Sequence, residues 1–190
     1  MKDLLIYLSL FFFISSCSNN TSTDHTKTED KERVVFFPVT VYLKGQIVEI
    51  KERGVTPLKY LIKGKKIDSS WLNMDHLAES FSDFLLPEID SLKLHDFFSV
   101  KEFYDQTLDK ITLTYEAKKD IPDQVKWLSW NIYINPEKGT VDRIYLVKRV
   151  SDKQTSQLTW IPYKNCKLTN IYDDGDTAFV ESEVKIKWDY

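Results

Sequence analysis

The sequence has few of the residues from which nucleotide-binding and nucleophile motifs are built. It contains only five glycines, and no phosphate-binding loop, Gly-x-Gly-x-x-Gly fingerprint or Gly-x-Ser-x-Gly elbow occurs. The three histidines, at positions 25, 76 and 95, lack the spacing that would group them with a third metal ligand. We therefore predict no metal, no cofactor and no catalytic residue, and we expect a protein that is not an enzyme.

Long hydrophobic runs and a charge excess are also missing. After Ile14, no segment approaches the roughly 18 consecutive apolar residues of a membrane-spanning helix. The 26 lysines and arginines are balanced by 29 aspartates and glutamates, which leaves a net charge of −3. A nucleic-acid-binding surface needs clustered basic residues, so we expect no nucleic-acid partner. The hydrophobic content of 42% and aromatic content of 14% are enough for a folded core.

The first 17 residues have the pattern of an export signal. A charged Met-Lys-Asp start precedes an uncharged run over residues 4–14, and small residues follow. The run is shorter than the roughly 20 residues of a permanent transmembrane helix. The segment Ile14-Ser15-Ser16-Cys17 resembles the lipobox of bacterial lipoproteins. This resemblance implies cleavage between Ser16 and Cys17 and acylation of Cys17, for example with palmitate. The alternative is an ordinary signal peptide that ends near a cysteine.

Lipidation of Cys17 would have consequences for both cysteines. Two or more acyl chains give stable membrane residence, so Cys17 would anchor the chain without a transmembrane helix. With Cys17 committed to lipid, Cys166 has no disulfide partner within the chain. We predict that Cys166 is a buried small hydrophobic residue.

A polar segment separates the signal from the folded part. Residues 18–33 contain no apolar side chain, which predicts a disordered tether. The chain thus divides into a signal peptide (1–16), a lipidated cysteine with its tether (17–33) and one domain (34–190). In proteobacterial lipoproteins an Asp after the cysteine means inner-membrane retention, and Ser18 instead resembles an outer-membrane signal. We expect an envelope protein anchored in the outer membrane. The sequence leaves open whether the domain faces the periplasm or the cell surface.

The domain begins with a predicted helix between Pro38 and Gly54, which suit its first turn and its C-terminal cap. The apolar residues between them fall on one helical face: Val39, Leu43, Ile47 and Ile50. The alternative is a pair of strands, 36–43 and 46–50, which the β-branched residues favour. We prefer the helix.

A short hairpin and a second helix are predicted next. Residues 58–62 and 66–71 flank Lys63-Gly64-Lys65, as in two paired strands. The second helix begins after its cap, Asn73, and ends before Pro87, whose ring disfavours helical geometry in the preceding residue. Its predicted buried face comprises Leu77, Phe81, Phe84 and Leu85.

From Val100 onward the apolar period is two, which is typical of strands. One side of these strands is apolar and the other mostly charged, as in an antiparallel sheet with one solvated face. In the last strand the apolar side comprises Val180, Val184, Ile186 and Trp188. The predicted fold class is α+β, in which two N-terminal helices, with the hairpin between them, pack on a C-terminal antiparallel β-meander of six to eight strands.

Aromatic side chains are the remaining clue to function. Trp130, Trp160 and Trp188 share the phase of aliphatic neighbours and are predicted core residues. Three aromatics of opposite phase are candidates for exposed contacts with a partner or a glycan: Trp127, Tyr133 and Tyr145. The alternative is that the second helix or a curled sheet covers them.

The order of signal, cysteine, polar tether and helix-then-meander domain resembles small membrane lipoproteins of Bacteroidota-type bacteria. The resemblance rests on three short segments: Phe36-Phe37-Pro38-Val39-Thr40, Asn135-Pro136-Glu137-Lys138-Gly139 and Ile186-Lys187-Trp188-Asp189. It implies no particular activity. We interpret the domain as a non-catalytic binding module for a protein or envelope component. The alternative is a carrier of a lipid or small hydrophobic ligand in a curled sheet, and a hydrolase is a weaker third reading. The sequence leaves the oligomeric state open.

Overall fold

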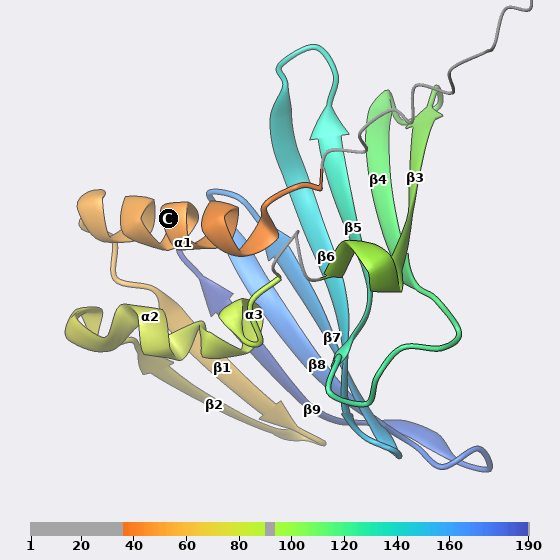
Figure 1. Cartoon of the computed structure of the whole chain (residues 1–190). Helices are drawn as coiled ribbons and strands as arrows, with labels where there is room; N and C mark the ends of the chain where they lie inside the picture. Colours follow the sequence, from red (N-terminus) through yellow and green to blue (C-terminus); the bar gives the residue numbers. More distant parts are fainter. Residues whose placement is uncertain (1–35, 90–93, 190) are drawn as a thin grey trace, which may run out of the picture. The chain divides into compact units, whose positions relative to one another are not determined.

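The computed structural model describes residues 36–89 and 94–189, which form one large antiparallel sheet with helices on one face (Figure 1). Nine strands lie in the order β2-β1-β9-β8-β7-β6-β5-β4-β3. The strands are β1 (Leu58–Lys63), β2 (Lys66–Trp71), β3 (Phe98–Asp105), β4 (Lys110–Ala117), β5 (Trp127–Asn135), β6 (Thr140–Ser151), β7 (Gln154–Ile161), β8 (Asn165–Asp173) and β9 (Ala178–Lys187). The helical elements are α1 (Val39–Glu52), η1 (Met74–His76), α2 (Leu77–Ser80), α3 (Ser82–Leu85) and η2 (His95–Phe97).

Seven of the strands form a meander, because each strand from β3 to β9 pairs with the next one along the chain. Gly139 lies in the β5–β6 turn with a φ of 62°, a conformation that glycine adopts without steric cost. The β1–β2 hairpin adds two strands beside β9, where Leu58 pairs with Lys187. The edge strands β2 and β3 follow one another in the chain, and the described residues between them include α2 and α3.

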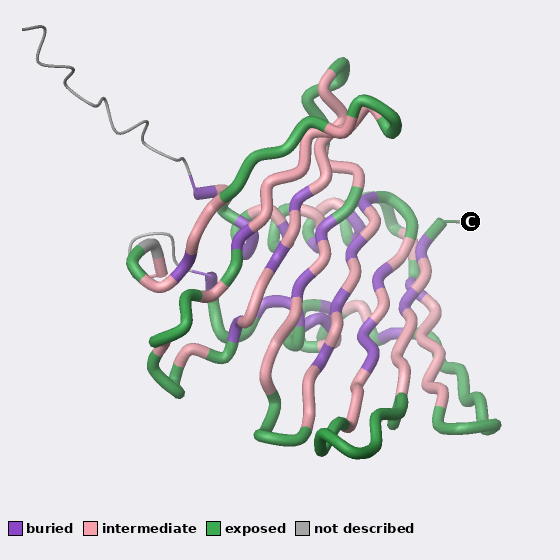
Figure 2. Tube along the Cα trace, turned by 90° about the vertical axis from the view of Figure 1, so that its right-hand side faces the viewer, coloured by how far each residue is buried: buried purple, intermediate pink, exposed green. Residues whose placement is uncertain are grey.

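The core lies between the helices and one side of the sheet, which we call the helix-side face and which includes Trp130, Trp160 and Ile186. Figure 2 shows that buried positions concentrate in the middle of the strands, whereas the turns are exposed. The Phe81 ring lies 5.2 Å from Trp160 and 5.9 Å from Trp188, measured between ring centroids. Such edge-on aromatic pairs add to the free energy gained from burial. We call the opposite side the outer face, which includes Tyr133, Thr159 and Lys185.

The predicted fold class is wrong in its proportions and its connections. The domain is mostly β, with nine strands instead of a meander of six to eight, because the hairpin joins the sheet. In the hairpin, Lys59 of β1 pairs with Ile186 of β9, which is a contact between distant parts of the sequence. The first predicted helix is present as α1, and its buried residues include all four of the predicted face: Val39, Leu43, Ile47 and Ile50.

The second predicted helix is broken into short pieces. Asn73 caps a 3-10 turn, because its side chain accepts a hydrogen bond from the Asp75 amide at 2.9 Å. The helix breaks again at Phe81, whose φ of −109° separates α2 from α3. Serines precede and follow Phe81, and serine side chains compete with helical backbone hydrogen bonds. All four residues of the predicted face are nevertheless buried: Leu77, Phe81, Phe84 and Leu85.

Candidate functional site

A row of polar side chains crosses the helix-side face of β6 to β9. The register aligns four residues, one on each strand: Lys148, Ser156, Asn170 and Ser182. The Ser156 hydroxyl donates to Asn170 Oδ1 at 2.6 Å, and Asn170 Nδ2 donates to Ser182 Oγ at 3.1 Å. The adjacent inward row toward the middle of the strands is apolar and comprises Leu146, Leu158, Leu168 and Val184. The polar row therefore marks the place where the apolar core ends.

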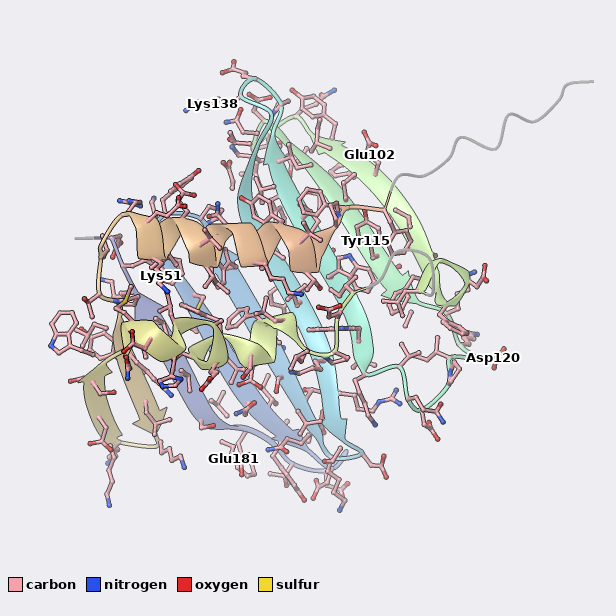
Figure 3. All side chains as sticks on the ribbon, turned by 60° about the vertical axis from the view of Figure 1, so that its left-hand side comes forward. Lys51, Glu102, Tyr115, Asp120, Lys138 and Glu181 are labelled. Atoms are coloured by element: carbon pink, nitrogen blue, oxygen red, sulfur yellow. The ribbon has the colours of Figure 1, made fainter. Side chains whose placement is uncertain are left out.

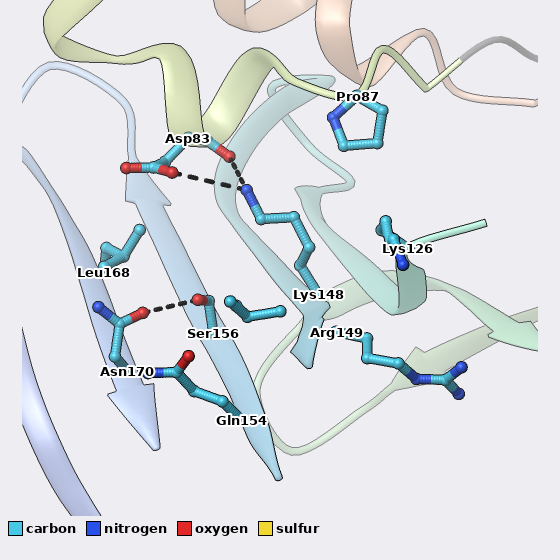
Figure 4. Close-up of a pocket in the computed structure, with 10 residues that line it drawn as sticks. Asp83, Pro87, Lys126, Lys148, Arg149, Gln154, Ser156, Leu168 and Asn170 are labelled. Carbon is cyan, nitrogen blue, oxygen red and sulfur yellow. Dashed lines mark hydrogen bonds and ion pairs between the residues drawn. The ribbon is translucent and has the colours of Figure 1, made fainter. Parts of the chain in front are cut away.

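Three residues of the polar row, Lys148, Ser156 and Asn170, line a pocket of about 420 Å³ beside α3 (Figure 4). Beyond the row, the Gln154 carboxamide donates to the Glu181 carboxylate. Glu181 lies at the end of the sheet opposite Lys138 (Figure 3). The lining residues are Asp83, Pro87, Lys126, Lys148, Arg149, Val150, Gln154, Ser156, Leu168 and Asn170.

Lys148 connects the sheet to the end of α3. Its ammonium donates to the carbonyl oxygens of Asp83 at 3.0 Å and Leu86 at 3.2 Å, and it lies 3.7 Å from the Asp83 carboxylate. Carbonyls at a helix C-terminus lack partners within the helix, and lysine side chains often supply them. Only 12% of the Lys148 side chain is exposed. This burial lowers the pKa of Lys148, and the nearby Asp83 carboxylate partly opposes the shift.

The pocket has a positive balance of charge. Lys126, Lys148 and Arg149 line it, with Asp83 as its one carboxylate. The Arg149 amide donates to the Lys126 carbonyl at 2.7 Å, which joins β6 to the segment before β5. Among the described lining residues there is no histidine or cysteine, and the Ser156 hydroxyl donates to an amide oxygen that is not a base. The excess of cations suits the binding of an anionic group.

Trp127 is not the exposed aromatic that its phase predicted. It is 1% exposed and lies on the helix-side face, where its indole N–H donates to the Pro87 carbonyl at 2.8 Å. A register shift between Trp127 and Ser129 is the cause, because an irregular residue in a strand reverses the alternation beyond it. The Trp127 ring lies 5.5 Å from the Lys148 ammonium, so it packs next to a residue that lines the pocket.

Tyr133 and Tyr145 lie on the outer face and are partly exposed. Arg143 lies over the Tyr133 ring at 4.0 Å, and Tyr145 is diagonal to Tyr133 across the β5–β6 pair. Burial raises the pKa of the Tyr145 phenol. The structure therefore brings these two residues together but separates both from Trp127.

The remaining predicted residues divide into one that is described and two that are not. Ser16 and Cys17 lie outside the described residues, so their cleavage and lipidation stay predictions. Cys166 is buried on the helix-side face, as predicted, and burial raises the pKa of its thiol well above the ordinary value. A protonated thiol is a poor nucleophile. Within residues 36–89 and 94–189, no cluster of acidic, histidine or cysteine side chains could hold a metal ion.

The pocket residues escaped the sequence reasoning because each looks like an isolated polar interruption. In β6 the inward positions read Ile144, Leu146, Lys148, and the break in phase appears in three other strands at the same register. Placing the four strands in register through their turns would have shown that these polar residues form a row.

Comparisons with protein-family models, with curated proteins and with solved structures find no match to this chain. No described helix is long and apolar enough to cross a membrane.

Proposed function

We propose that this chain is a non-catalytic binding module of the cell envelope, anchored through Cys17, that holds an acidic partner in the pocket beside α3. The observation that supports binding is the described lining, which includes Lys126, Lys148 and Arg149 but only one carboxylate, that of Asp83. A carboxylate or phosphate of a protein or envelope component complements such a lining. The anchor is supported by the lipobox-like segment Ile14-Ser15-Ser16-Cys17.

Packing of the core supports the module over the lipid carrier. A carrier needs an enclosed apolar cavity of about 300 Å³ or more. Between the helices and the sheet, Trp160 and Trp188 have ring centroids 5.0 Å apart, and Phe84 lies 5.5 Å from Trp160. These side chains occupy the space that a carrier would keep open, and the pocket beside α3 is instead lined in part by charged residues.

Titration with an acidic peptide tests the binding proposal. The detergent-solubilised full chain should bind a short polyglutamate peptide, and added salt should weaken the binding because charge attraction drives it. Replacing Lys126 and Arg149 together by Gln should lower the affinity about tenfold, as expected for lost charge-assisted hydrogen bonds.

The matched control replaces Arg53 and Lys119, two exposed cations outside the pocket, by Gln. An equal loss in this control would show that the peptide reads only the overall charge. Absence of binding to wild type would refute the acidic partner.

Cell fractionation tests the anchor separately. Cys17→Ala should release the protein from the membrane fraction or leave it uncleaved, because the lipid attachment site is gone. Normal processing together with sedimentation after a carbonate wash would refute the lipoprotein proposal.

A further inference from the structure

The β1–β2 hairpin presents its apolar side on the outer face, away from the helices. Lys59 pairs with the buried Ile186, which places Lys59 on the helix-side face and its two neighbours in β1 on the outer face. Cross-strand partners point to the same side, so β2 continues the apolar surface. We call this surface the hairpin patch, which comprises Leu58, Tyr60, Ile62, Ile67 and Trp71.

The hairpin patch is unusually exposed for its composition. Trp71 is 63% and Ile67 is 65% exposed, whereas the other four tryptophans are at most 1% exposed. By contrast, the outer face of β7, in the middle of the sheet, is polar at Thr155, Gln157 and Thr159. A concentrated apolar surface with a polar rim marks a docking site.

Lysines surround the hairpin patch. Lys185 and Lys187 of β9 pair directly with Tyr60 and Leu58, and Lys167 lies beside Lys185. Lys167 is ion-paired with Glu183 at 3.2 Å and Lys187 with Asp189 at 3.5 Å. Three further lysines lie at the hairpin turn: Lys63, Lys65 and Lys66. This local positive charge contrasts with a chain that has more acidic than basic residues.

We propose that the hairpin patch docks on an anionic lipid bilayer, a contact that does not depend on the proposed pocket function. Tryptophan and tyrosine prefer the membrane–water interface, which suits Trp71 and Tyr60. Lysine side chains extend along apolar surfaces while their ammonium groups reach lipid phosphates. Protein–protein interfaces are enriched in arginine and depleted in lysine, and the basic residues named here are all lysines. This composition favours a lipid surface over a protein partner.

Trp71 provides a local probe even if the full chain also attaches through its first 17 residues. Brominated lipids quench a tryptophan only when it lies in the bilayer, and the other four tryptophans are shielded in the core. With phosphatidylglycerol vesicles, brominated lipid should quench the emission of the full-length wild type. Trp71→Phe should abolish most of this quenching.

The lysines supply the second arm of the experiment. Replacing Lys185 and Lys187 by Gln should raise the phosphatidylglycerol concentration needed for half-maximal quenching about fivefold for each lysine removed. Lys138→Gln, in the β5–β6 turn and separated from β9 by β7 and β8, should leave that concentration unchanged. Vesicles of brominated phosphatidylcholine should quench the Trp71 emission much less than brominated phosphatidylglycerol does.

Two results would overturn the proposal. The first is vesicle-bound protein whose Trp71 emission is insensitive to brominated phosphatidylglycerol, since the patch would then not touch the bilayer. The second is a blue shift of Trp71 emission that follows protein concentration without vesicles, which would mean that a second copy covers the patch.

Discussion

The helix-side face of β6 to β9 has a covered half and an open half, although the same four strands form both. In the covered half, Phe81 and Phe84 pack over Trp160, and the inward residues are apolar. Two rows further along, the inward residues become hydrogen-bonded and charged: Lys148, Ser156, Asn170 and Ser182. Strand alternation decides which side chains point inward. The extent of the helical cover decides which of these inward positions are apolar.

Removing the aromatic centre of the covered half should have the largest effect. Trp160→Ala should lower the free energy of unfolding by about 3–5 kcal/mol, because a fully buried ring leaves a cavity. Denaturant melts measure this loss. The control, Trp71→Ala, removes an exposed ring and should cost less than about 1 kcal/mol. Equal losses would contradict the described core.

Lys148 should contribute more to stability than a surface lysine. Lys148→Met should lower the free energy of unfolding by about 1–3 kcal/mol, because two carbonyl oxygens at the end of α3 lose their donor. Hydrogen exchange should show faster opening of α3 in this variant. Lys138→Met, in an exposed turn, is the control. If both variants behave alike, Lys148 does not hold α3 on the sheet.

A smaller loss is expected within the polar row. Ser156→Ala should cost about 1 kcal/mol, since the Ser156 hydroxyl no longer donates to Asn170. A double-mutant cycle with Asn170→Ala isolates the pairwise contribution. A coupling energy near zero would mean that solvent replaces this hydrogen bond without loss.

The smallest effect is a pH dependence that belongs to Lys148. Its pKa is lowered in the folded state, so the unfolded chain binds more protons between that pKa and the ordinary value of 10.5. The stability of wild type relative to Lys148→Met should therefore rise as the pH increases toward 10.5. Tyrosine titrations shared by both proteins cancel in this difference. A difference that falls with pH would show that the charged form is favoured in the folded state.

The sequence predicted local elements better than their extent or their partners. The helical spacing of Val39 and Leu43 predicted α1, and the turn at Gly64 predicted the hairpin. The break at Phe81, which lies between two serines, interrupts a helix that apolar spacing alone favoured. The pairing of β1 with β9 depends on contacts between the two ends of the domain, which period and propensity do not report.

Strand irregularities explain the other errors of orientation. The register shift beside Trp127 turned a predicted exposed aromatic into a buried one. Between β8 and β9, Asn170 pairs with Ser182 but Ile171 pairs with Val180, which skips one residue of β9. Val180, which alternation predicted to point inward, therefore lies on the outer face and is 58% exposed. The polar row was missed for a related reason, because its residues meet only when the strands are aligned. Lipidation of Cys17 remains a prediction outside the described residues.

The place of β1 beside β9 also sets an order of events for folding. The hairpin can form locally, but the strand that attaches it to the sheet is the last one in the chain. Closing so long a loop costs chain entropy before any contact compensates for it, and such topologies fold slowly. During synthesis, the hairpin can therefore pair with the sheet only after β9 has emerged, and until then the edge of β1 is unpaired.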